Sequence, residues 1–392
     1  MVHFEKIDLK TFLSEYWQKK PLVLPKALPN FINALTPDEL AGLAMEEEIE
    51  SRIVFETPEK SPYWHLKRGP FLEKDFANLP ETHWTLLVQG VDRFLPEVSS
   101  MLDYFNFIPQ WRIDDVMISY AAEQGSVGPH YDNYDVFLYQ AKGRRKWSLT
   151  TKNCHEANSL SGIDLRIMAQ FEVEEEYILE EGDMLYLPPH VGHYGIALSG
   201  NCMTYSFGYR SYQDQELWNS FAEYMEEKAR STRLYEDPNW TELRGAAELP
   251  QQASQNAKKL LLDMVNDEEQ LNAWFGCFAT CLDQQAEALL PMPIEDESVD
   301  IGIFINELKN SEGLIRNPLC RFAYQLAEKE PFISLFINGC QWDVTEVSID
   351  LIKLVANSRF LERELLLPFL SHKKNSAFLF DLWTLQWLES QN

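Results

Sequence analysis

The chain has 392 residues, more than one hydrophobic core usually organises, so two or three domains are expected. Its 61 acidic and 34 basic residues give a net charge of -27, which would repel a phosphate backbone and attract a basic partner, so direct nucleic-acid binding is not expected. The first residues lack the apolar run of a signal peptide, no apolar stretch is long enough to cross a membrane, and the 6 cysteines form no CxxC pair, so a reduced, cytoplasmic protein is expected.

Residues 1–210 are predicted to form one domain that begins with helices. A first helix is expected over residues 9–18. A second helix begins after Thr36, which can cap it, with Pro37 in the first helical position and Glu39 completing a capping box.

From about residue 112 the pattern changes to short segments with period-two alternation, which is typical of β-strands. Glycine and proline turn signals separate these segments. Many short strands with this spacing indicate a sandwich or a barrel. Strands are predicted over residues 115–121, 134–140, 146–150, 172–179, 183–187 and 203–209.

Residues 211–290 show helical periodicity with wide apolar faces. Such a face outside the main core often pairs with a second copy of the chain, so we interpret this region as a helical dimerisation domain. The alternative is that it packs against the first domain. The two apolar clusters are Leu217, Phe221, Tyr224 and Met225, and Leu260, Leu261, Met264 and Val265.

Residues 291–392 combine a hairpin with helices, which is typical of a small winged-helix-like domain. Asn338 and Gly339 are the residue types of a type I′ turn. From Gln341 to the end there are 7 acids and 5 bases, a net charge of -2, whereas a DNA-reading wing is normally basic. A structural or protein-binding role is therefore expected. Helices are predicted over residues 347–356 and 361–367.

The segment that begins at Gly128 carries a candidate metal site. His130 and Asp132 are two residues apart at the start of a predicted strand, which would place both side chains on one face. Two histidines and one carboxylate hold Fe(II) and leave three coordination positions open. Either His190 or His193, which follow a Pro-Pro turn at the end of a predicted strand, could supply the third ligand, and periodicity does not choose between them.

An oxoacid that chelates such a metal needs a cation for its far carboxylate. In the predicted strand after Gly143, the apolar residues Trp147 and Leu149 should face inward, and Arg145 shares their parity. A buried arginine suits a carboxylate that is paired bidentately, although an ion pair with an internal acid is the structural alternative. The residues expected to face outward are Arg144, Lys146 and Ser148.

These motifs together resemble those of the Jumonji-C oxygenases. More closely, they resemble the bacterial ribosomal oxygenases, which hydroxylate an arginine side chain of large-subunit ribosomal protein sixteen. The similar stretches cover much of residues 10–210. They are the segment Gly-Pro-His-Tyr-Asp-Asn-Tyr-Asp-Val-Phe from Gly128, Gly-Arg-Arg-Lys-Trp from Gly143, Leu-Pro-Pro-His-Val-Gly-His up to His193, and the segments beginning at Phe12 and Trp111.

The resemblance implies an α+β fold with three parts: a double-stranded β-helix (Jumonji-C, cupin-like) barrel over residues 1–210, a helical dimerisation domain over 211–290 and a C-terminal winged helix over 291–392. It also implies the site residues. These are His130, Asp132 and His193 for the metal, Arg145 and the weaker candidate Ser119 for 2-oxoglutarate, and Asp115, Tyr134 and Ser206 for the substrate side chain.

The resulting hypothesis is an Fe(II)- and 2-oxoglutarate-dependent dioxygenase that hydroxylates an arginine side chain of a basic ribosomal protein and works as a homodimer. An acid facing a guanidinium gives charge-assisted hydrogen bonds, and a tyrosine ring can lie along the alkyl stem. One alternative is a Jumonji-C demethylase or a hydroxylase of another residue, because demethylation begins with the same hydrogen abstraction. The other is a non-catalytic cupin-like regulatory module, against which the complete triad and the matched Arg145 argue.

Overall fold

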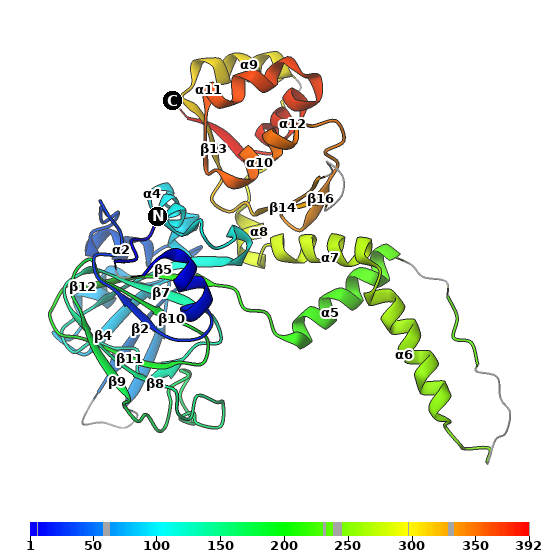
Figure 1. The fold of residues 1–392 in the computed structure, drawn as a ribbon. Coiled ribbons are helices and arrows are strands. Elements are labelled where there is room, and N and C mark those ends of the chain that lie inside the picture. Colours follow the sequence, from blue (N-terminus) through cyan, green and yellow to red (C-terminus); the bar gives the residue numbers. More distant parts are fainter. Residues whose placement is uncertain are drawn as a thin grey trace. The chain divides into compact units, whose positions relative to one another are not determined.

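The computed structural model describes residues 1–5, 7–57, 63–229, 233–237, 245–296, 298–327 and 333–391. The chain divides into two compact units, Met1–Ser211 and Tyr212–Asn392 (Figure 1). Among the described residues, no helix is both long and apolar enough to cross a membrane.

The first unit contains two sheets in which every pairing between strands is antiparallel. The larger sheet has the order β1-β10-β7-β12-β5-β4-β2-β3, and the smaller has the order β6-β11-β8-β9. The larger sheet is built from β1 (Leu22–Leu24), β2 (Ser51–Glu56), β3 (Trp64–Arg68), β4 (Trp84–Val88), β5 (Ile113–Ala121), β7 (Val136–Lys142), β10 (Met184–Leu187) and β12 (Cys202–Tyr209). The smaller sheet is built from β6 (His130–Tyr131), β8 (Arg145–Thr150), β9 (Glu175–Leu179) and β11 (Gly192–Ala197).

Short helices pack against one face of the larger sheet. Successive side chains of β7 point to opposite faces of the larger sheet. Phe137 packs in the hydrophobic core that includes Phe12 and Leu40 of the helical elements, whereas Leu138 packs in a second core with Trp147 of the smaller sheet. The helical elements are α1 (Leu9–Thr11), a π-turn (Phe12–Tyr16), α2 (Pro37–Leu43), α3 (Glu73–Ala77), α4 (Pro96–Met101) and 3₁₀ turns at Val91–Arg93, Leu102–Phe105 and Gln110–Arg112.

The predicted elements of this unit are largely confirmed. The capping box of α2 is present, with Thr36 accepting from the Glu39 backbone and Glu39 accepting from the Thr36 backbone. All six predicted strands exist with small shifts of their ends. One local prediction was wrong: β6 ends at Tyr131, so Asp132 follows the strand and does not lie within it.

The predicted strands do not include β2, β3, β4 or β11. In β4 an apolar run interrupted only by Thr85 gives no period-two signal, because the strand is buried on nearly all of its length. In β11, Gly192 and Gly195 interrupt the alternating pattern. Neighbouring side chains lie too close to both positions for a larger residue, and a Cβ at Gly195 would lie 2.6 Å from the Trp147 ring.

The second unit is helical at first and then mixed. Its small sheets have the orders β17-β13-β18 and β14-β15-β16. Asn338 and Gly339 both have positive φ between β15 and β16, which confirms the predicted hairpin. The elements are α5 (Asp214–Tyr224), a π-turn (Met225–Ala229), α6 (Gln251–Val265), α7 (Glu268–Thr280), α8 (Gln284–Leu289), α9 (Ile301–Asn310), β13 (Gly313–Arg316), β14 (Phe322–Leu326), β15 (Ile333–Ile337), β16 (Cys340–Trp342), α10 (Ile349–Asn357), β17 (Phe360–Glu362), α11 (Arg363–Leu366), a 3₁₀ turn (Leu367–Ser371), α12 (Lys373–Thr384) and β18 (Leu388–Gln391).

The helix predicted over residues 361–367 begins later than expected. Residues 360–362 form β17, and the backbone turns through α11 into a 3₁₀ turn that contains Pro368 near its start. Leu361 is fully buried in the core of this unit, and its pairing with Leu314 of β13 outweighs the local helical signal.

Candidate functional site

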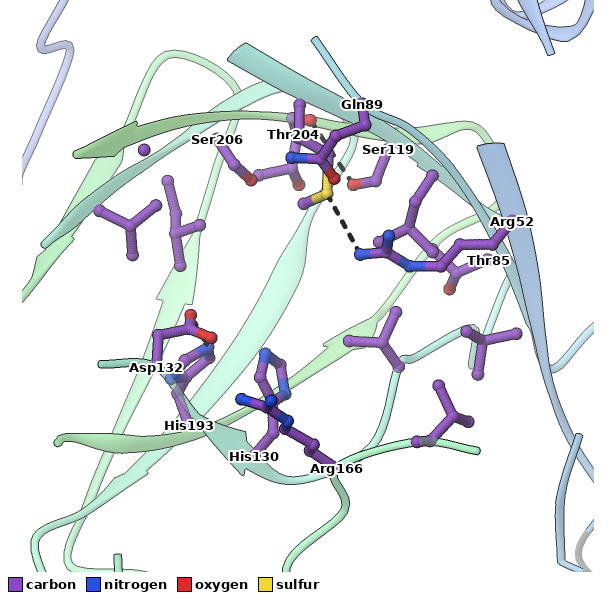
Figure 2. A pocket seen from close by; sticks show the side chains of 18 of the residues that line it. Arg52, Thr85, Gln89, Ser119, His130, Asp132, Arg166, His193, Thr204 and Ser206 are labelled. Carbon is purple, nitrogen blue, oxygen red and sulfur yellow. Dashed lines mark hydrogen bonds and ion pairs between the residues drawn. The ribbon is translucent and has the colours of Figure 1, made fainter. Parts of the chain in front are cut away.

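His130, Asp132 and His193 lie together inside the first unit (Figure 2). One potential ligand atom from each side chain lies within 4.8 Å of the other two, and His193 Nε2 is 3.6 Å from Asp132 Oδ2. The two imidazoles meet because β6 and β11 are neighbours with His130 opposite His193 in the register. Among the described residues this is the one cluster of three histidine, cysteine or carboxylate side chains with metal-site spacing.

Backbone carbonyls orient both histidines. Nδ1 of His130 lies 2.9 Å from the Gly128 carbonyl, and Nδ1 of His193 lies 3.0 Å from the Val191 carbonyl. A carbonyl can only accept, so each Nδ1 carries the proton and donates, which leaves the Nε2 lone pair available for a metal. Burial, together with the charge of His130, lowers the pKa of His193 to about 4, so its imidazole is neutral at pH 7.

His190 lies outside this cluster. Its backbone has a φ of 63°, its side chain is exposed, and its N–H donates to the Asp132 carbonyl. The turn that contains His190 therefore supports the loop of Asp132, while the structure brings His193 beside the other two side chains.

A buried carboxylate anchors the loop that follows Asp132. Asp135 is completely buried and accepts hydrogen bonds from the Tyr186 hydroxyl at 2.6 Å and from Gln18 at 3.2 Å. The Arg112 guanidinium lies 3.5 Å from it. These contacts tie the loop between β6 and β7 to the larger sheet, and they give Asp135 a positioning role that the sequence did not reveal.

The three clustered side chains line a cavity of about 510 Å³ that also holds buried polar atoms without partners. Arg145 is 3% exposed, and its Nε and Nη2 lack a hydrogen-bond partner. The same is true of Trp147 Nε1 and Thr85 Oγ1, which line the same cavity. A buried guanidinium without an anion is costly, so this part of the cavity fits a bound carboxylate.

The predicted orientation of β8 is confirmed for Arg145, Trp147 and Leu149, which are all buried. Lys146 and Ser148 share the opposite face, where both contact Glu176 of β9. Ser148 was expected to face outward, but it is buried there and donates to Glu176 at 2.7 Å.

Ser119 and Thr204 form a pair of hydroxyls on the cavity wall. The Ser119 hydroxyl lies 3.5 Å from the Thr204 carbonyl, and the Thr204 hydroxyl lies 3.3 Å from Gln140 Oε1. Both residues are buried on adjacent strands, β5 and β12, in direct register. Their hydroxyls can add hydrogen bonds to an acid held by Arg145.

Another part of the cavity is anionic. Asp115 is buried, and its Oδ2 accepts from Gln89 at 2.7 Å and from the Gly90 N–H at 2.9 Å. Burial and the nearby charges of Asp92 and Asp114 raise the pKa of Asp115 to about 7. Ionisation of such a carboxyl is favoured by a cationic partner.

Tyr134 and Ser206 complete the set of predicted residues on the cavity wall. The Tyr134 side chain is 41% exposed, so its ring is accessible to a ligand, and the charge of Asp132 raises the pKa of its phenol. Ser206 is buried on β12. The structure therefore brings all eight predicted residues to one cavity.

Sequence reasoning missed Thr85, Gln89 and Arg166, which also line the cavity. Thr85 and Gln89 belong to β4 and its end, a strand that was not predicted. A polar residue within the apolar run of residues 84–88 is the signal that could have marked Thr85. Arg166 lies in the long connection between β8 and β9, where no periodicity exists to orient it.

The fold and the clustered side chains define a JmjC-type protein. The JmjC domain model matches residues 100–217. The chain is 37% identical over 307 residues to the "Ribosomal protein uL16 3-hydroxylase" of Escherichia coli (strain K12), covering 78% of this chain and 79% of that protein. It is also 40% identical over 210 residues to a "Probable ribosomal oxygenase" of Haemophilus influenzae, covering 53% and 50%.

A solved structure of YcfD, a ribosomal oxygenase from Escherichia coli in complex with cobalt and 2-oxoglutarate, is similar over 100% of both chains, with 31% identity and a TM-score of 0.83. The chain belongs to the family of JmjC ribosomal oxygenases. The family predicted from the sequence motifs is confirmed, as is a JmjC, cupin-like fold of mixed α and β content with antiparallel sheets.

Proposed function

We propose that the chain is an Fe(II)- and 2-oxoglutarate-dependent dioxygenase that hydroxylates an arginine side chain of ribosomal protein uL16. The observation that carries the proposal is the pairing of a His-Asp-His cluster with a buried arginine that lacks an anion, in one cavity. The family relationship supports it, because the similar proteins are described as a uL16 3-hydroxylase and as a complex with cobalt and 2-oxoglutarate.

In this proposal His130, Asp132 and His193 hold the metal through two Nε2 atoms and one carboxylate oxygen. Bound Fe(II), with 2-oxoglutarate and dioxygen, supplies the oxidising power for inserting oxygen into a C–H bond. Arg145 holds the far carboxylate of 2-oxoglutarate, with Ser119 as an additional donor. Because these donors are buried and their strands are paired on both sides, the co-substrate is held in one orientation.

The substrate side chain is proposed to lie between Asp115 and Tyr134. The Asp115 carboxylate accepts from the guanidinium, and the exposed Tyr134 ring covers the alkyl stem. Ser206 is placed to accept or donate one further hydrogen bond. The net charge of -27 suits a basic ribosomal protein, which it would attract over a long range.

Mass spectrometry of uL16 tests this function. Cells that lack the protein should contain uL16 without the added oxygen, and expression of the wild-type chain should restore a mass increase of one oxygen on one arginine-containing peptide. The His130→Ala variant should not restore it. An unmodified uL16 in the wild-type cells would contradict the proposal.

Asp115→Asn is expected to remove the pH dependence of substrate capture. Since the pKa of the buried Asp115 is raised to about 7, the wild-type kcat/KM for the basic substrate should fall as the pH drops below about 7, where the carboxyl becomes neutral. The variant should be slow at every pH from 6 to 8, with kcat/KM reduced roughly tenfold to a hundredfold at pH 8. A pH profile of succinate formation makes the comparison.

The same substitution should stabilise the protein at alkaline pH. The pKa of Asp115 in the folded state lies above its ordinary value of 3.8, so its contribution to stability is lost as the pH rises through about 7. Asparagine carries no charge to bury, so the melting temperature of Asp115→Asn should exceed that of the wild type at pH 8. A melting temperature below the wild-type value there would show that the ionised carboxylate is well compensated.

For the architecture, we propose that the two sheets of the first unit form a double-stranded β-helix barrel around this cavity. We also propose a helical dimerisation domain over residues 211–290, a winged-helix-like domain over residues 291–392 with a structural or protein-binding role, and a cytoplasmic location. An apolar groove of about 360 Å³ between α5 and α6 supports dimerisation, since Trp218 and Leu261 on its walls are 49% and 51% exposed.

Replacing both Trp218 and Leu261 by glutamate is expected to produce a monomer, because each charge would have to be buried in the interface. Light scattering coupled to size-exclusion chromatography measures the mass. Leu234, which is 81% exposed and does not line the groove, provides the matched control as Leu234→Glu. A double variant that keeps the mass of a wild-type dimer would exclude this groove as the interface.

A further inference from the structure

Arginines other than Arg145 also line the cavity, and one of them, Arg166, is used neither by the metal cluster nor by the proposed oxoglutarate site. Arg166 comes from the connection between β8 and β9 and shares the cavity wall with His130 and Asp132. In Figure 2, Arg166 lies on the same side of the cavity as His130, Asp132 and His193. Gln89 and Ser206 lie on the opposite side. Gln89 donates a hydrogen bond to Asp115, so the Asp115 carboxyl lies towards that opposite side.

The backbone around Arg166 is fixed to the segment that carries the metal cluster. The Met168 N–H donates to the Pro129 carbonyl at 2.7 Å, and Pro129 directly precedes His130. Ile167 is buried against Gly128, where φ is 83° and a Cβ would lie 2.8 Å from Ile167 Cδ1. The backbone of Arg166 is therefore fixed at the cavity wall by the two anchored residues that follow it.

The charge of Arg166 is available to a ligand. In the part of the chain that the structure describes, no carboxylate lies within ion-pair distance of it, whereas the nearby Arg68 is paired with Asp164 at 2.6 Å. Arg166 thus brings a positive charge to the metal end of the cavity, whereas the Asp115 carboxyl lies towards the other end, where Arg52 also lines the wall. A cationic side chain is attracted by Asp115 and repelled by Arg166.

We propose that Arg166 is a specificity-determining residue that keeps positively charged atoms away from the metal. This inference rests on the proposed function. An arginine substrate can place its guanidinium against Asp115 and leave an aliphatic carbon at the metal. An N-methylated lysine, in contrast, must bring its cationic methylammonium group to the metal before it can be demethylated. Arg166 therefore favours hydroxylation of a carbon remote from the charge over demethylation.

The size of the effect follows from Coulomb's law. Two unit charges about 6 Å apart in a solvated cavity mouth repel each other enough to weaken the binding of a cationic side chain, relative to a neutral one, by roughly three- to tenfold. Salt weakens such an effect, because Arg166 is exposed.

Peptide affinity, measured without oxygen, tests this role. The full chain is loaded with Fe(II) and 2-oxoglutarate under anaerobic conditions, and fluorescence anisotropy gives the Kd of three uL16 peptides that differ at the target position. One carries arginine, one trimethyllysine and one the neutral norleucine. In Arg166→Gln the trimethyllysine peptide should bind three- to tenfold more tightly than in the wild type, while the other two peptides change less than twofold. Arg166→Lys, which keeps the charge, should behave like the wild type.

Two results would overturn the proposal. The first is an unchanged affinity ratio between the trimethyllysine and norleucine peptides in Arg166→Gln, and the second is an equal change for all three peptides, which would indicate a general peptide contact. Because binding is measured without turnover, neither result depends on hydroxylation. A failure of the proposed function would instead appear as unmodified uL16 in wild-type cells.

Discussion

His193→Ala is expected to reduce succinate formation to below about one thousandth of the wild-type rate, because substitutions that only disturb the partners of metal ligands already cost about 10- to 100-fold. His193 is buried, and its Nδ1–H is fixed on the Val191 carbonyl, so its Nε2 is held at the cluster. His130→Ala should have the same effect. Titration with Co(II), followed by its absorption spectrum, should show metal affinity lost in parallel with activity.

His190→Ala is the matched control, since it removes the same type of side chain three residues earlier in the same turn. His190 is exposed and lies outside the cluster, and its contact with the Asp132 loop uses the backbone N–H, which alanine retains. The variant should keep at least half of the wild-type turnover and its metal affinity. Loss of metal binding in His190→Ala, with retention in His193→Ala, would mean that the third ligand has been assigned to the wrong histidine.

The choice between these two histidines shows where sequence reasoning ended. Both follow the same Pro-Pro turn, and residue spacing left them equivalent. The difference is produced by the backbone: His190 adopts a positive φ and turns outward, and β11 begins at Gly192, so that His193 pairs with His130. Strand β11 carries two glycines and was not predicted, so its register could not have been obtained from periodicity.

Arg145 represents the opposite case, in which local alternation was sufficient. Strand β8 lies between β11 and β9 and is regular over its whole length, so parity with Trp147 and Leu149 assigned Arg145 to the interior. The same reasoning could not reach Gln89 or Arg166. Gln89 meets Asp115 only because β4 pairs with β5, and Arg166 belongs to a connection without regular structure.

Arg145→Ala is expected to raise the KM for 2-oxoglutarate by about 100-fold, because two charge-assisted hydrogen bonds in a buried site are worth about 3 kcal/mol. The kcat at saturating co-substrate should fall much less, since Arg145 is proposed to hold a carboxylate remote from the reacting atoms. Steady-state kinetics with varied 2-oxoglutarate separates the two parameters. Arg144→Ala, at the adjacent exposed position, is the matched control and should leave both unchanged.

The stability of the same variant gives an independent readout. In the wild type without ligand, Arg145 is a buried cation whose Nε and Nη2 lack partners, so its removal should not lower the melting temperature of the ligand-free protein. The stabilisation that 2-oxoglutarate adds to the metal-loaded protein should shrink by about 3 kcal/mol, because ligand stabilisation depends on the ratio of concentration to Kd. If Arg145 instead formed a structural ion pair, Arg145→Ala would lose much stability and would respond to 2-oxoglutarate as the wild type does. That result would show that Arg145 has no part in holding the co-substrate.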